Sequence, residues 1–95
     1  MTDETIVAWR DDVDLRNIGE KRDEIDRVLD GPAVGTLVID LAELDFVDSL
    51  GLGVLIHARD RCAGAGTALI LRSVPPRTRK LLQTAGLDTL FTIEP

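Results

Sequence analysis

The chain is poor in the side chains that build catalytic and disulfide-stabilised sites. Its 95 residues include one cysteine, Cys62, and one histidine, His57. A single cysteine excludes an internal disulfide. His57 is the only imidazole base available to a serine nucleophile, and on a shared helix it would lie roughly 12 Å along the axis from Ser49 at ~1.5 Å per residue. We therefore expect no catalytic residue and no enzyme.

Metal and nucleotide motifs are missing as well. Asp11, Asp12 and Asp14 are the only clustered acids with ligand potential, and their spacing is typical of a solvated, helix-capping turn. The Gly-Leu-Gly run at 51–53 lacks the third glycine of a dinucleotide loop and the lysine of a phosphate-binding loop. We expect neither a metal nor a cofactor.

Positive charge is in short supply. The chain has 11 basic and 17 acidic residues and a formal net charge of −6. Such a field repels phosphate backbones and anionic lipids, so nucleic acid and membrane are poor partners and a basic protein surface is a better one. No apolar run approaches the length of a membrane span, and the acidic start at 1–4 is unlike a signal peptide, so we expect a cytoplasmic protein.

What the sequence does contain is the pattern of one small α/β domain over residues 1–95. Hydrophobic residues make up 44% of the chain, enough for a single core. Apolar runs predict strands at 5–9, 36–41, 68–72 and 90–93, and helical spacing predicts helices at 15–29, 50–63 and 76–85. This alternation favours a single layer of about four strands, largely parallel, with helices packed against the sheet.

Two helices carry more detailed expectations. Asp14 is expected to cap the first, with Leu15, Ile18, Ile25, Val28 and Leu29 on its buried stripe. In the second, one stripe faces the sheet and another lies beside Ser49. The sheet-facing stripe is Gly51, Leu55, Ala58 and Cys62, and the other is Leu50, Gly53, Val54, His57 and Arg61.

The segment Phe46–Leu55 carries the most informative signal. It places Asp48 and Ser49 where an apolar strand gives way to a helix. A helix start has unpaired N–H groups and a partial positive charge, so a phosphate on Ser49 would be stabilised there. Ser49 is therefore a candidate switch, and the simpler alternative is that it only caps the helix.

The stretch from Leu37 to Leu55 resembles bacterial anti-sigma factor antagonists of the STAS family. Their pattern is an apolar strand, an aspartate, and then Asp-Ser-(Ser/Thr)-Gly-Leu-Gly opening a helix. Val13-Asp14, the run 79–82 and the run 85–87 resemble further parts of that family. Leu50 departs from the pattern, because it stands where the family usually has serine or threonine.

The resemblance implies a function by docking. Unmodified protein would bind an anti-sigma factor that is also a serine kinase and so free a sigma factor, phosphorylation of Ser49 would end the binding, and a phosphatase would reset it. The residues expected to meet the partner are Asp14, Asp48, Ser49, Leu50, Gly53 and His57. For these, plainer roles stay open: caps for both aspartates, core for Leu50 and a solvated position for His57.

Two other functions compete with this one. A constitutive docking subunit of an ATPase, a transporter or a signalling scaffold would need no phosphorylation. A phosphoaspartate receiver would use Asp40, Asp45 or Asp48, but receivers are longer domains with a lysine partner, and after Lys21 the only lysine is Lys80.

Overall fold

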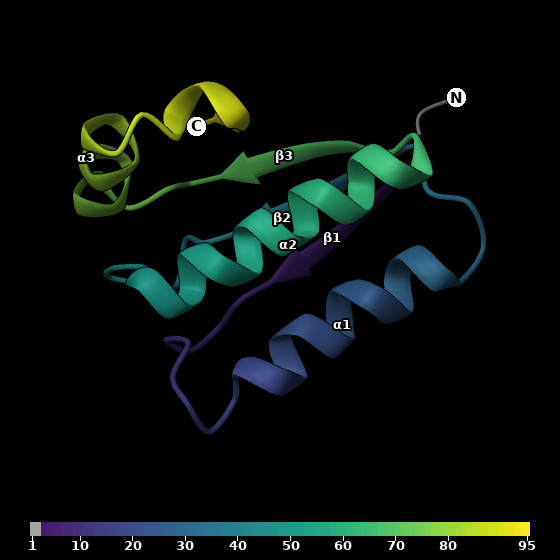
Figure 1. The fold of residues 1–95 in the computed structure, drawn as a ribbon, viewed down its shortest axis with the longest axis horizontal. Helices are drawn as coiled ribbons and strands as arrows, with labels where there is room; N and C mark the ends of the chain where they lie inside the picture. The colour runs from purple at the N-terminus through teal and green to yellow at the C-terminus, as the bar shows by residue number, and fades with distance from the viewer. Residues whose placement is uncertain (1–2) are drawn as a thin grey trace.

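The computed structural model describes residues 3–95 and contains a four-stranded, fully parallel sheet in the order β1-β2-β3-β4 (Figure 1). The strands are β1 (Glu4–Ala8), β2 (Thr36–Asp40), β3 (Ala68–Arg72) and β4 (Thr92–Glu94). The expected α/β architecture is confirmed. Met1 and Thr2, which begin the acidic N-terminal run, lie outside the described residues.

Three helices accompany the sheet. They are α1 (Ile18–Asp30), α2 (Ser49–Ala65) and α3 (Pro76–Thr84), followed by the short 3-10 helix η1 (Asp88–Leu90). Figure 1 shows α1 and α2 side by side, and α3 at the end of the molecule where β3 ends and α2 begins. Between residues 3 and 95, no helix is both long and apolar enough to cross a membrane.

The core forms between α1, α2 and one face of the sheet. Val7, Ile39 and Leu71 stand in register on three adjacent strands, and all are buried in one cluster with Ile25 and Leu55. Residues 37–39 of β2 are fully buried, as the near-continuous apolar run predicts for a central parallel strand. Strand β2 lies between β1 and β3, and its central residues are buried on both faces of the sheet.

The start of the first helix differs from the prediction. Helix α1 begins at Ile18, and Leu15 is 80% exposed instead of lying on the buried stripe. Residues 15–17 form a turn whose backbone N–H groups at Arg16 and Asn17 bond to the Asp14 side chain. Asp14 therefore caps this turn, while the α-helical N-cap is Asn17, whose side chain makes no capping bond.

Two strand boundaries also differ. Strand β2 ends at Asp40, whose carboxylate accepts the Ala42 N–H at 2.9 Å, so Phe46 and Val47 belong to a loop before α2 and not to a strand. At the other end, 88–90 form η1 and the last strand starts at Thr92. Local side-chain and i to i+3 bonds, which compete with the sheet, explain both shifts.

Candidate functional site

The candidate site is the start of α2, at the end of the loop 41–48. Asp48 is the N-cap, with extended backbone geometry, and its Oδ1 accepts the N–H groups of Leu50 at 3.0 Å and Gly51 at 3.2 Å. Ser49 is the first residue of the helix and is exposed, and its hydroxyl makes no hydrogen bond to any other residue in the range 3–95. The role of helix cap thus belongs to Asp48 and not to Ser49.

Gly51 sets how closely α2 approaches the loop before it. A Cβ on Gly51 would lie 2.5 Å from Val47 Cγ1 and 3.7 Å from Val13, both of them buried side chains. No larger residue is accommodated without movement of this packing. The contact also brings the loop between β1 and α1, which contains Val13 and Asp14, to the base of the same helix end.

Thr78 anchors the same loop from the opposite side. Thr78 is a fully buried residue of α3, and its hydroxyl oxygen accepts the Val47 N–H at 2.8 Å. A buried N–H left without a partner costs about 1–3 kcal/mol, so this bond stabilises the loop that leads into Asp48 and Ser49. Sequence reasoning missed Thr78, although a threonine four positions before the buried Leu82 was the available signal.

Asp14 uses its carboxylate within its own turn. Its Oδ1 accepts the N–H of Arg16 at 2.8 Å and of Asn17 at 3.1 Å, and its side chain is 46% exposed. The backbone N–H of Arg16 is the main cause that lowers the pKa of Asp14 below 3.8. The Asp14 carboxylate therefore stabilises the turn as an anion, while part of its side chain stays exposed.

The four residues of the stripe expected to face the sheet, Gly51, Leu55, Ala58 and Cys62, are all buried, and Gly51 packs against Val47 and Val13 of two loops. The second stripe does not form an open surface beside Ser49. Val54 is only 1% exposed, and Leu50 is half-buried against the core. The physical reason is that α1 packs along this side of α2, which the sequence pattern could not reveal.

His57 and Arg61 belong to this α1 contact. His57 Nε2 lies 2.8 Å from Asp26 Oδ1, and Arg22 Nη2 lies 3.4 Å from His57 Nδ1. Arg61 Nη1 donates to the same Asp26 oxygen at 2.8 Å. The His57 side chain is 19% exposed, so it points into the seam between helices instead of standing free on the Ser49 surface.

The open surface next to Ser49 is made of small and half-buried residues. Gly53 is exposed with empty space where a Cβ would stand, and Ile56, one turn further on, is half-buried. Ser49, Gly53 and Ile56 recur at helical spacing and so share one face. Ile56 was not predicted as part of this face.

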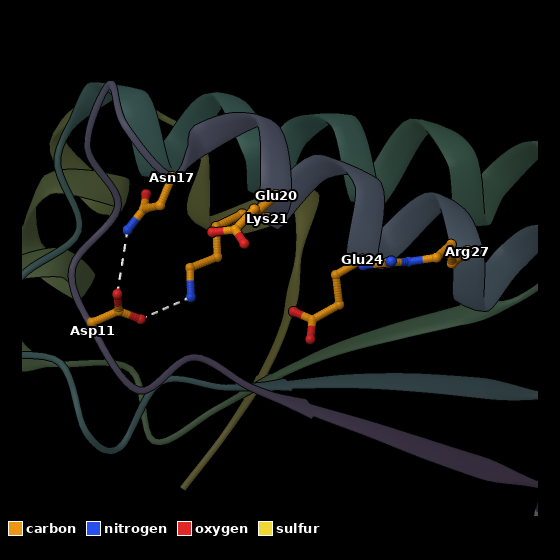
Figure 2. A pocket seen from close by; sticks show the side chains of 6 residues that line it. All are labelled: Asp11, Asn17, Glu20, Lys21, Glu24 and Arg27. Carbon is orange, nitrogen blue, oxygen red and sulfur yellow. Dashed lines mark hydrogen bonds and ion pairs between the residues drawn. The ribbon is translucent and has the colours of Figure 1, made fainter.

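A polar cavity of about 210 Å³ lies along α1, close to the turn at Asp14 (Figure 2). Lys21 Nζ lies 3.0 Å from Asp11 Oδ1 and 5.9 Å from the centroid of the Trp9 ring, and the Lys21 hydrogen bond is the main cause that lowers the pKa of Asp11. The lining residues are Asp11, Asn17, Glu20, Lys21, Glu24 and Arg27. Within residues 3–95, no group of three acidic, histidine or cysteine side chains is arranged to hold a metal ion.

The packing around Gly51 gives a stability prediction with a matched control on the same helix. Gly51→Ala is expected to lower the free energy of unfolding by about 1–3 kcal/mol, because the new methyl group overpacks against Val47. Gly53→Ala, which meets open space, should instead raise it by up to about 1 kcal/mol through better helix propensity. Urea unfolding of both variants measures this, and equal effects would show that Gly51 is not sterically required.

The turn at Asp14 gives a pH prediction. Because the folded pKa of Asp14 is lowered, its carboxylate contributes stability in full above the unfolded value near 3.8, and this contribution is lost as pH falls through the folded pKa. Asp14→Ala should therefore lower the melting temperature at neutral pH, and the gap to wild type should narrow in acid. Asp12→Ala is the control, because the Asp12 side chain forms no hydrogen bond within the described range. A difference in melting temperature between Asp14→Ala and wild type that stays constant with pH would contradict the role given to the Asp14 carboxylate.

The fold is similar to those of solved structures. The fold matches a structure from Thermotoga maritima, tm1081, a proposed anti-sigma factor antagonist, with a TM-score of 0.86 and 19% identity over 98% of this chain and 80% of that one. It also matches an anti-sigma factor antagonist from Mycobacterium paratuberculosis, with a TM-score of 0.77 and 26% identity over 97% and 77% of the two chains.

Sequence comparison identifies the family of the chain. A STAS-domain containing protein of Pseudomonas aeruginosa (strain UCBPP-PA14) is 33% identical over 72 residues, which are 76% of this chain and 69% of that protein. The family model described as STAS domain matches residues 2–95. The chain belongs to the STAS domain family.

Proposed function

We propose that this chain is an anti-sigma factor antagonist that binds an anti-sigma kinase while Ser49 is unmodified and releases it once Ser49 is phosphorylated. The observation that carries the proposal is the exposed hydroxyl of Ser49 at the first position of α2, which makes no hydrogen bond within residues 3–95 and stands beside an aspartate that already caps the helix. Because this hydroxyl is exposed and does not cap the helix, a kinase can modify it without disrupting the cap. The structural neighbour from Mycobacterium paratuberculosis, an anti-sigma factor antagonist, supports the same role.

Electrostatics explains how one phosphate would act as a switch. Phosphorylation adds about −1.5 to −2 charges at neutral pH. The first turn of α2 has no acidic side chain, and the partial positive charge of the helix start favours the added group. The protein itself should therefore remain folded after modification.

A partner that covers the unmodified hydroxyl is affected differently. Burying the phosphate without compensation costs several kcal/mol, and each ~1.4 kcal/mol reduces affinity tenfold. Moderate complementarity to the neutral serine is thus enough to give binding in one state and release in the other.

The proposed contact surface is narrower than the six residues expected from the sequence. It consists of Asp48, Ser49 and Gly53, which are exposed, with the accessible part of Leu50 at its edge. Asp14 joins it through Val13, which packs against the base of α2. His57 is not part of it, because Asp26 and Arg22 hold its ring toward α1.

The receiver alternative has no comparable support. The Asp40 carboxylate, which ends β2, accepts the Ala42 N–H and so serves the turn after the strand. Asp48 is likewise committed to two backbone N–H groups.

The test uses the full chain, its cognate anti-sigma kinase and ATP. Mass spectrometry should place phosphate on Ser49, and Ser49→Ala should remain unphosphorylated while still binding the kinase. Ser49→Asp should bind at least about tenfold more weakly, since a tenfold loss corresponds to ~1.4 kcal/mol.

Ser73→Asn is the matched control, because Ser73 has a φ of 56°, a left-handed conformation that asparagine tolerates. It should leave both phosphorylation and binding unchanged. Phosphate at another residue would contradict the proposal, and a complex that neither Ser49 variant weakens would favour the constitutive docking subunit.

A further inference from the structure

We infer that a groove between α3 and Phe46 docks an acidic segment of the partner protein, with one apolar side chain of that segment inserted between its walls. This inference rests on the proposed function in one respect only, namely that the segment belongs to the same protein that covers Ser49. The groove itself is defined by residues of α3 and of the loop before Asp48.

The groove has an apolar floor and a cationic rim. Its volume is about 420 Å³, and its lining residues are Phe46, Arg77, Lys80, Leu81 and Thr84. Phe46 and Leu81 are both half-buried, and the Arg77 guanidinium carbon lies 4.9 Å from the centroid of the Phe46 ring. An aliphatic or aromatic side chain flanked by carboxylates is the chemistry that matches both parts.

The charge on α3 stands apart from that of the whole molecule. The chain has a net charge of −6, yet α3 contains Arg77, Arg79 and Lys80 and none of the 17 acidic residues. In the range that the structure describes, these three cations form no ion pair, whereas Lys21, Arg61 and Arg72 each lie against a carboxylate. Three cations without an ion-pair partner in the described range, two of which (Arg77 and Lys80) line the apolar groove, favour an acidic partner segment.

The groove lies close to Ser49, because a hydrogen bond joins α3 to the loop that leads into Ser49. Phe46 lies only three positions before Ser49, and the residue between Phe46 and Asp48 donates its N–H to Thr78 on α3. Figure 1 shows α3 at the same end of the molecule as the start of α2. A partner seated on Ser49 can therefore place a neighbouring segment in the groove without any change of fold.

The first test adds a synthetic peptide with a central leucine flanked by glutamates to the full chain. Binding is followed by two-dimensional NMR of the backbone amide groups. Peptide addition should shift the amide signals of Phe46 and Leu81. Lys80→Glu, on the groove rim, should weaken binding by about tenfold or more, because a like charge replaces an attractive one. Arg79→Glu carries the same charge change on the same helix but does not line the groove, and it should bind nearly as well as wild type.

Several results would overturn the inference. A peptide flanked by lysines that binds equally well would remove the charge argument, and equal losses in both variants would reduce the effect to general electrostatics. Inorganic phosphate that produces the same shifts would make the groove a small-anion site. Self-association that Lys80→Glu abolishes would make a second copy of the chain the occupant.

The partner measurement separates this inference from the proposed function. If Lys80→Glu weakens the anti-sigma kinase complex while Ser49 proves not to be phosphorylated, the groove stands and the switch fails. If Ser49 phosphorylation controls binding while Lys80→Glu binds as tightly as wild type, the switch stands and the groove is overturned.

Discussion

The arrangement at the start of α2 depends on the pair of hydrogen bonds from the Leu50 and Gly51 N–H groups to the Asp48 carboxylate. Every helix leaves N–H groups unsatisfied at its start, and a side-chain cap is worth about 1 kcal/mol. Because the residue before Ser49 supplies the cap, the serine hydroxyl has no structural bond to keep. The same interaction therefore stabilises α2 and leaves a reactive group exposed at its tip.

Contacts on two sides hold the loop before Asp48 and so keep Ser49 in its exposed position at the start of α2. Thr78 accepts the Val47 N–H from one side, and the absence of a side chain at Gly51 lets Val47 and Val13 pack under the helix from the other. The contacts of Asp26 with His57 and Arg61, both at 2.8 Å, hold the neighbouring helix α1 along α2. A modification at Ser49 is thus expected to act on what docks there, and not by unfolding the loop.

Much of the fold was predictable from the sequence because its signals are local. The burial of the apolar run at 37–39 and the Asp48 cap, which the sequence left open as one role of that residue, depend on neighbours within a few residues, and the structure contains both. The failures arise where a distant segment decides the outcome. Val54 was expected beside Ser49, but its surroundings are set by how α1 packs on α2, and the groove near Phe46 forms only when α3 folds back beside a loop some thirty residues earlier.

The affinity of the anti-sigma kinase for two forms of this protein, unmodified and phosphorylated on Ser49, tests the central claim most directly. Isothermal titration of the two forms under the same ionic conditions should give a dissociation constant at least about tenfold higher for the phosphorylated form, a difference of ~1.4 kcal/mol or more. Equal dissociation constants for the two forms would contradict the claim that the exposed hydroxyl of Ser49 controls docking.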